Sequence, residues 1–323
     1  EIPCCYPPLA LYCCQLLGER GLANPIAAMT FVDVLHGLNF GLLFLLLRGL
    51  DFDVPLAAFG TLLGAVWIYA SEGASIVIEP FGTLALLAAL LAATWNRPPL
   101  AAAVIGVALA CAVLTKPQHG VYLPPLFLLA AVGLGPRPAP RSPWQSLAIA
   151  AAAFAATLFV APVVLGLPWS ETLARAIGWG VADDYPTTGI KGLVLALTTG
   201  PGPGRVVLVW LAVAALLTWR ATTPTHSAML TGLALSILPL AIRHYGHYAQ
   251  LSAVWVVLVT LFAAREFAAA ARDRAAFERL LALLIALPLI PVWLATVPVS
   301  YRHATTRPRF QQQSDTGEVV QTA

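Results

Sequence analysis

Long apolar runs alternate with short polar stretches along this chain of 323 residues. A transmembrane helix needs about 20 predominantly apolar residues, because each residue adds about 1.5 Å across a hydrocarbon core about 30 Å thick. The runs are continuous and do not alternate, so the pattern favours helices over membrane strands. If somewhat shorter runs are allowed, about ten candidate spans appear, at residues 27–47, 54–70, 76–95, 99–114, 121–134, 144–165, 206–219, 228–242, 249–264 and 280–297.

The predicted fold is therefore all-α, a polytopic membrane helix bundle. Residues 1–300 would form the transmembrane domain, and residues 301–323 would begin an outer soluble segment. Composition supports this class, since 59% of the residues are hydrophobic and only 10% are charged, against about 25% charged in soluble domains. The net charge is only +3. No basic patch is interleaved with aromatic residues, so nucleic acid is not an expected partner.

The number of spans between two polar segments predicts whether these segments lie on the same side of the membrane. Ten spans place both chain ends on one side, here called outer, together with the turn at Lys116, the long loop at residues 168–204 and the segment at residues 243–248. Nine arginines and lysines fall on each side, so a raw count does not orient the chain. The short inner turns at residues 95–98 and 136–141 carry arginines, as the positive-inside rule favours.

Lys116, Pro117, Gln118 and His119 interrupt two apolar runs. A charge at membrane depth is costly, so such a lysine usually pairs with another group or contacts a ligand. Pro117 cannot continue a helical hydrogen-bond ladder, so we expect a turn. In the alternative interpretation, Lys116 only extends its ammonium to the lipid headgroups.

The outer side gathers cations, carboxylates and aromatic rings. Lysine and arginine bind phosphate, which makes Lys116 and Arg243 the candidates for an anionic headgroup, and carboxylates can act as bases. The alternatives are structural, since Glu79 before Pro80 suits a helix N-terminus and paired loop aspartates are usually solvated. The candidate substrate-binding residues are Lys116, Gln118, His119, Arg243, His244, His247, Tyr248, Glu79, Asp183 and Asp184.

No cofactor or resident metal is predicted. His244 and His247 lie three residues apart, but zinc requires three or four ligands. Hydrogen bonding or ring stacking is the more common role of such a pair, and a divalent cation stays open. Asp33 and His36, also three apart, can pair across a helical turn and are interpreted as structural.

Three stretches resemble the GT-C glycosyltransferases, a family with relatives among protein O-mannosyltransferases and lipid A aminoarabinose transferases. They are residues 6–9 (Tyr-Pro-Pro-Leu), residues 115–118 (Thr-Lys-Pro-Gln) and the pair His247-Tyr248, and the resemblance runs over nearly the whole chain. It implies a multi-pass enzyme of the plasma or inner membrane with its active face outside the cytoplasm. A hexose or pentose would pass from a polyprenyl-phosphate carrier to a glycan, lipid or protein acceptor.

In the implied mechanism, a carboxylate deprotonates the acceptor and cations stabilise the departing phosphate. Members of the family carry a first membrane helix and a catalytic aspartate before the Tyr-Pro-Pro-Leu stretch, so we expect that base to precede Glu1 and assign no catalytic residue here. We also expect an outer domain after residue 323, and no activity from the chain without the missing base. At Ala253 and Val254 the chain departs from the proline that many members carry.

A secondary transporter of a small polar or anionic solute is the alternative function. Transporters usually place ionisable residues near the bilayer midplane, between two related halves. Here the polar residues gather at one end, and no repeat between halves is visible, which favours an enzyme. A ligase or polymerase of lipid-linked oligosaccharides would use the same donor and differ only in its acceptor.

Overall fold

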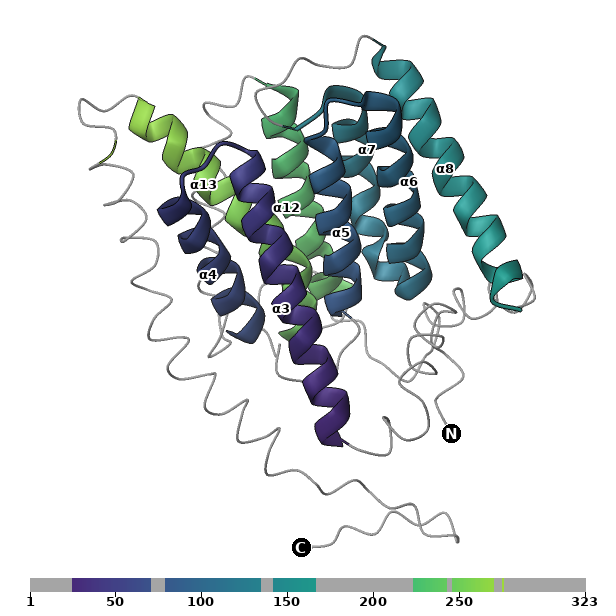
Figure 1. The fold of residues 1–323 in the computed structure, drawn as a ribbon, viewed down its shortest axis with the longest axis horizontal. Helices are drawn as coiled ribbons and strands as arrows, with labels where there is room; N and C mark the ends of the chain where they lie inside the picture. Colours follow the sequence, from purple (N-terminus) through teal and green to yellow (C-terminus); the bar gives the residue numbers. More distant parts are fainter. Residues whose placement is uncertain are drawn as a thin grey trace, which may run out of the picture.

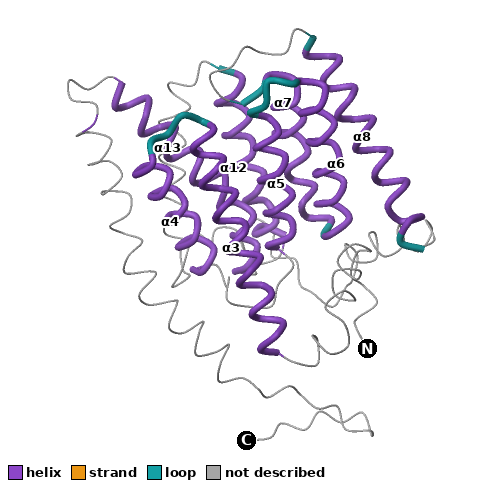
Figure 2. Tube along the Cα trace, in the orientation of Figure 1, coloured by secondary structure: helices purple, strands orange, loops and turns teal. Residues whose placement is uncertain are grey.

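A computed structural model describes residues 25–70, 79–134, 142–166, 223–242, 246–269 and 275 of the chain. Every regular element in these ranges is helical, and Figure 2 shows only helices joined by short loops. The all-α prediction is therefore confirmed for the described residues. The α-helices are α3 (Pro25–Gly49), α4 (Val54–Ala70), α5 (Glu79–Ala93), α6 (Pro98–Thr115), α7 (Leu123–Val132), α8 (Pro143–Val164), α12 (Pro224–Ile242) and α13 (Ala253–Ala269), with the 3₁₀ helices η1 (Pro117–Tyr122) and η2 (Gly246–Ser252).

The helices pack side by side in one bundle. In Figure 1, α5, α6, α7 and α12 occupy the middle, α3, α4 and α13 lie on one side, and α8 lies along the opposite edge. Helix α6 packs against both α5 and α8, while α3 packs against α4 and α5. The consecutive helices α3 and α4, and likewise α5 and α6, run antiparallel because the turns that join them are short.

Among the described residues, three helices are long and apolar enough to cross a membrane: Thr30–Gly49 of α3, Pro98–Thr115 of α6 and Pro143–Val164 of α8. Helices α4 and α5 are apolar but shorter. Helix α7 has 10 residues, about 15 Å, and is shorter than the predicted span at residues 121–134 because η1 takes up the first part of that run. A helical membrane bundle fits the structure, whereas the number of about ten spans stays a prediction.

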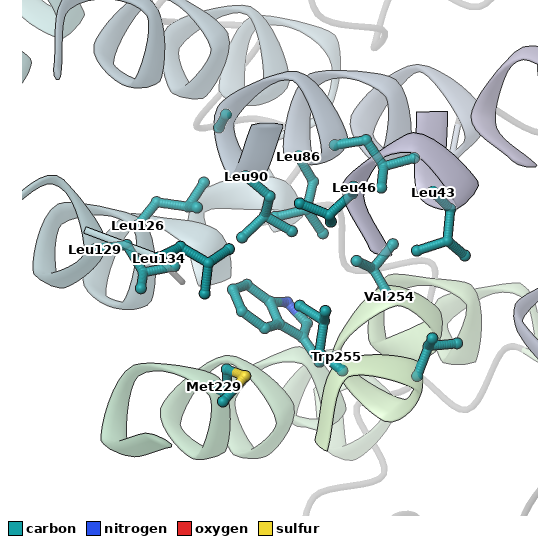
Figure 3. Close-up of a cluster of buried hydrophobic side chains, with 14 of the residues drawn as sticks. Leu43, Leu46, Leu86, Leu90, Leu126, Leu129, Leu134, Met229, Val254 and Trp255 are labelled. Carbon is teal, nitrogen blue, oxygen red and sulfur yellow. The ribbon is translucent and has the colours of Figure 1, made fainter. Parts of the chain in front are cut away.

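The interior of the bundle is filled by aliphatic side chains around two buried tryptophans, Trp67 and Trp255. Figure 3 shows Trp255 of α13 surrounded by side chains from α5, α7 and α12, among them Leu90, Leu126 and Met229. Gly232 of α12 makes room for this ring, since a Cβ there would lie 2.5 Å from the indole. Small residues at such contacts allow membrane helices to approach closely.

Arg265 of α13 holds the turn between α3 and α4. Its guanidinium lies 4.6 Å from the centroid of the Phe52 ring and 4.4 Å from that of Phe262. It also donates to the carbonyl of Leu50 at 3.0 Å, which satisfies one of the carbonyls left open at the end of α3. This turn and those at residues 94–97 and 133–134 lie at one end of the bundle, here called the far end (Figure 2).

The 3₁₀ helices η1 and η2 lie together at the other end, here called the site end. The Tyr122 hydroxyl of η1 donates to the carbonyl of Leu251 in η2 at 3.2 Å. The co-location that span parity predicted is therefore confirmed for these two segments. Several predicted elements and residues lie outside the described ranges: the spans 206–219 and 280–297, the loop 168–204 with Asp183 and Asp184, Arg243, His244, and the segment 301–323.

Candidate functional site

Lys116 sits where α6 ends. Its own backbone is extended, with φ −159° and ψ 124°, and Pro117 opens η1 directly afterwards. Proline has no N–H and fixes φ, so it begins a new helical turn where α6 cannot continue. The Lys116 N–H still donates to the Ala112 carbonyl at 3.0 Å, and its carbonyl accepts from the His119 N–H at 2.9 Å. The predicted turn at Pro117 is confirmed.

The ammonium of Lys116 forms an ion pair with the carboxylate of Glu79, the first residue of α5. The side chains of Lys116 and Glu79 are only 6% and 1% exposed. Lysine is almost never buried without a partner, and here the carboxylate supplies the opposite charge. The interpretation in which Lys116 extends to the headgroups is therefore wrong. The prediction that Glu79 begins a helix is confirmed, and the positive end of the α5 dipole favours its carboxylate.

Tyr248 of η2 covers this ion pair. The Lys116 Nζ lies 4.5 Å from the centroid of the Tyr248 ring, within the range of a cation–π interaction. Directly after Glu79 in the sequence, the carbonyl of Pro80 accepts from Nδ2 of Asn39 in α3 at 2.9 Å. Four elements, α3, α5, η1 and η2, thus meet around one buried cation and one buried anion.

His119 lies next to the pair and is fully buried. Its Nδ1 is 2.9 Å from the Ala112 carbonyl. A carbonyl only accepts, so Nδ1 carries the proton and Nε2 is left as an acceptor. Within the described part of the chain this Nε2 makes no hydrogen bond. The imidazole stacks on the ring of Tyr122, with the ring centroids 5.9 Å apart and an angle of 3° between the ring planes. It packs so closely on Gly82 that a Cβ there would lie 2.2 Å from the imidazole.

Burial lowers the pKa of His119 from 6.5 to about 4, and the negative charge of Glu79 only partly opposes this shift. The charged form of an imidazole is disfavoured where water is absent. His119 is therefore neutral at physiological pH. It contributes a hydrogen-bond acceptor beside the Lys116–Glu79 pair and adds no further positive charge.

The structure brings part of the predicted set together. Lys116, Glu79, His119 and Tyr248 are in one cluster, with the half-buried Gln118 next to them on η1. His247 belongs to η2, but its side chain is not described. The other four candidates, Arg243, His244, Asp183 and Asp184, lie outside the described residues.

Sequence reasoning missed Asn39, Tyr122 and Gly82. Asn39 had a usable signal, since an amide inside an apolar span needs a partner. Tyr122 and Gly82 had none, because a tyrosine after a turn and a glycine in a helix are each common. Their roles depend on contacts between distant elements, Tyr122 with Leu251 and Gly82 with His119.

The described residues do not fit a metal ion. Histidine, cysteine and carboxylate side chains form no group of three or more in the part of the chain that the structure covers. The chemistry of the cluster is that of a buried cation whose counter-ion is a protein carboxylate. Such an ammonium can bind a phosphate in place of the carboxylate or beside it, since it has three N–H donors.

Comparison with known proteins supports the fold. No protein-family model and no curated protein sequence matches this chain. A solved structure does match, the archaeal oligosaccharyltransferase AglB from Archaeoglobus fulgidus in complex with an inhibitory peptide and a dolichol-phosphate, with a TM-score of 0.50 at 16% sequence identity. The likeness covers 90% of this chain and 48% of AglB, so the chain spans about half the length of that enzyme. The helix bundle is thus GT-C-like in fold.

Proposed function

We propose that this chain belongs to a membrane glycosyltransferase that moves a sugar from a polyprenyl-phosphate carrier to an acceptor at the outer face of the cell membrane. The observation that carries the proposal is the buried Lys116 ammonium at one end of a GT-C-like bundle. The AglB structure with this fold holds a dolichol-phosphate, which is a carrier of the proposed kind. The protein O-mannosyltransferases and aminoarabinose transferases are the relatives that the sequence resemblance suggests.

Lys116 would bind the phosphate of the donor. In the described structure its charge is compensated by Glu79. A phosphate that replaces or joins the carboxylate keeps the ammonium compensated throughout, so the cation is never buried alone. A desolvated ammonium also interacts more strongly with the growing charge of a leaving phosphate than it would in water. The second proposed phosphate ligand is Arg243, which lies just before η2 in the sequence.

Tyr248 must move for the phosphate to reach Lys116. Its ring lies over Nζ, and the Lys116 side chain is only 6% exposed. Tyr248 belongs to η2, a 3₁₀ segment of seven residues. The hydrogen bonds of 3₁₀ helices are poorer than those of α-helices, and long 3₁₀ runs are uncommon. We therefore assign to η2 the conformational change that admits the donor.

The proposed reaction conserves atoms and charge. The acceptor oxygen or nitrogen forms a bond to the anomeric carbon as the bond from that carbon to the phosphate oxygen breaks. The electron pair goes to the phosphate, and the proton of the acceptor goes to a carboxylate that acts as the general base. Lys116 stabilises the phosphate as it leaves.

The test uses the full-length protein reconstituted in liposomes, with sugar transfer measured from radiolabelled donors. A polyprenyl-phosphate sugar should be consumed, and a nucleotide sugar without lipid carrier should not, because only the lipid-linked donor presents the proposed leaving group at the membrane. Turnover of a purified nucleotide sugar in the absence of any lipid carrier would contradict the proposed mechanism.

A further inference from the structure

The carboxylate of Glu79 lies directly beside the place where a phosphate would bind Lys116. Its Oε1 accepts a hydrogen bond from the Lys116 ammonium, whose three N–H donors belong to a single nitrogen. A second oxygen bound to the same nitrogen at ordinary hydrogen-bond length therefore lies roughly 5 Å from the first. A phosphate that joins the pair is thus brought next to the negative charge of Glu79.

Neighbouring elements fix the start of α5, which carries this carboxylate. The Pro80 carbonyl accepts from Nδ2 of Asn39 in α3 at 2.9 Å. Gly82, three residues after Glu79, lies so close to His119 of η1 that a Cβ would be 2.2 Å from the imidazole. The side chain of Glu79 can rotate, but its backbone is tied to both neighbours. A phosphate that displaces the carboxylate from the ammonium therefore still meets its charge at short range.

The charges of the pair are poorly screened, because both side chains are buried. Electrostatic interactions between groups excluded from water are stronger than at a surface and respond less to salt. Burial and, to a smaller extent, the charge of Glu79 raise the pKa of Tyr122, which stays neutral like His119. The pair is faced from η1 and η2 by the titratable side chains of His119, Tyr122 and Tyr248, whereas Asp33 and His36 of α3 face Tyr69 of α4.

Lys116 is the one lysine or arginine at the site end among the residues that the structure describes. The others in these ranges lie toward the far end: Arg48, Arg97 and Arg265. The described site therefore holds one positive and one negative charge, and a bound ligand adds its own charge to this neutral pair. Burying uncompensated charge is costly, so a ligand with two negative charges is held less well than a ligand with one.

The two lipids of the proposed reaction differ in this charge. The phosphate of the sugar donor is a diester with one negative charge, whereas the carrier left after transfer is a monoester with a charge of about −1.5 to −2 at pH 7. We propose that Glu79 is a specificity-determining residue, whose carboxylate makes the site prefer the singly charged donor over the doubly charged spent carrier. The inference rests on the proposed function, because it takes Lys116 to bind the phosphate. Its consequence is release of the carrier once the sugar has been transferred.

The proposed second ligand, Arg243, would not change the sign of this effect. A second cation attracts both lipids, but the repulsion by Glu79 still acts on the additional negative charge of the monoester. The role of Glu79 is therefore visible as a change in the ratio of two affinities, in which contributions common to both lipids cancel.

The experiment measures the binding of two lipids to the full-length protein in nanodiscs. One is polyprenyl phosphate, and the other is its methyl ester, which keeps a single negative charge and carries no sugar. At pH 8 we expect the wild type to bind the methyl ester about tenfold more tightly, because an additional charge close to a buried carboxylate is strongly repelled. At pH 5 the monoester loses its second charge, since its second pKa is about 6, and the two affinities should agree within about twofold.

Glu79→Gln should lower this ratio at pH 8 by about tenfold, chiefly because polyprenyl phosphate binds more tightly. Glu79→Asp, which withdraws the charge by one methylene, should lower the ratio by a few-fold. Asp51→Asn is the matched control, since it removes one negative charge from the exposed turn at the far end and should leave the ratio unchanged. The left-handed backbone of Asp51, with φ 62°, tolerates asparagine. Lys116→Ala should weaken the binding of both lipids.

The outcomes separate the specificity from the phosphate site. If the wild type binds both lipids equally at pH 8, or if Glu79→Gln keeps the ratio of the wild type, the role of Glu79 is refuted, while weaker binding of both lipids by Lys116→Ala still supports the phosphate site. Where Glu79→Gln does not fold, Glu79→Asp takes its place, and an unchanged ratio in that variant refutes the role equally. If the wild type binds neither lipid, or if Lys116→Ala binds both as tightly as the wild type, the proposed function and this inference are both overturned.

Discussion

Lys116 and Glu79 place two charges inside an apolar helix bundle, where burying hydrocarbon side chains would cost less free energy. Removing two ions from water costs several kcal/mol each, and their attraction repays this only with good geometry and further hydrogen bonds. Breaking such a pair by removing one partner typically costs about 3–5 kcal/mol, while replacing both by apolar residues is often neutral. Stability alone therefore does not explain why this chain buries the pair, whereas the proposed role toward an anionic ligand would.

Lys116→Ala tests that role directly. Removing one well-placed donor to a developing charge typically costs about 2.7–4 kcal/mol, or roughly a hundred- to a thousandfold in turnover. Lys116→Arg should restore only part of the rate, because a planar guanidinium does not replace a compact ammonium in a tight turn. Turnover of the full-length enzyme is measured at saturating donor.

Arg97→Ala is the control for this change, since it removes an exposed cation at the opposite end of α6 and should leave turnover unchanged. Near-normal turnover of Lys116→Ala would remove Lys116 from the site and make Arg243 the better phosphate ligand.

His119 should make stability depend on pH. Its pKa in the folded protein is about 4, below the unfolded value of 6.5, so between these values the unfolded chain binds more protons. The free energy of unfolding should therefore rise with pH from about 4 to 6.5, by up to about 1.4 kcal/mol per pH unit. The contribution is fully present above pH 6.5 and is lost as the pH falls toward 4.

The measurement is thermal unfolding in detergent between pH 4.5 and 7 for the wild type and for His119→Asn. The variant is expected to be less stable at pH 7 but to lose the part of the slope that His119 supplies. Identical slopes for the two proteins would show that His119 is accessible to protons in the folded state, contrary to its burial.

Close helix contacts depend on glycine at particular positions. At Gly106 of α6 a Cβ would lie 2.2 Å from the Ala150 carbonyl oxygen of α8, whereas at Gly41 of α3 it would meet nothing within 4 Å. The two glycines look alike in the sequence, since each lies in the middle of an apolar run. Only the packing of α8 on α6 distinguishes them.

Gly106→Ala should force α6 and α8 apart and lower the melting temperature by several degrees, since overpacking typically costs about 1–3 kcal/mol. Gly41→Ala is the matched control and should be neutral or slightly stabilising, because alanine favours a helix over glycine by about 1 kcal/mol. Both are measured by thermal unfolding in the same detergent. Equal effects of the two substitutions would mean that α8 does not pack on α6 at Gly106.

At the scale of the whole molecule, the bundle separates two ends of different character. The site end holds η1, η2 and the start of α5, and the far end holds the short turns between consecutive helices (Figure 1). The proposed function requires such an arrangement, with the polar chemistry at one face of a membrane. The bundle shares its fold with about half of AglB.

The proposed orientation predicts which end faces the outside of the cell. In a background without the five native cysteines, Gly120→Cys at the site end should react with a membrane-impermeant maleimide on intact cells. Asn96→Cys, exposed at the far end, should react only after permeabilisation. The opposite pattern would place the site end in the cytoplasm and contradict the proposed localisation, and the known reactivity of each variant in detergent is the control.

The sequence by itself determined the class of the protein and much of its helix order. Apolar runs set the helices, since a buried or lipid-facing helix needs no surface polarity, and α4 begins and ends where the run at residues 54–70 predicts. Pro117 predicted the break between α6 and η1, because proline cannot donate to the helical ladder. Span parity alone predicted that the Lys116 and Tyr248 segments lie at one end.

Only the tertiary structure decided what those polar residues do for one another. That Lys116 pairs with Glu79, that Tyr248 covers the pair, and that Asp33 meets Tyr69 all depend on contacts between helices far apart in the chain. Hydrophobic periodicity carries no such information here, because these helices are apolar on nearly every face. Which face of each helix turns inward is fixed by close packing, by glycines such as Gly82 and by the few polar side chains that must find a partner.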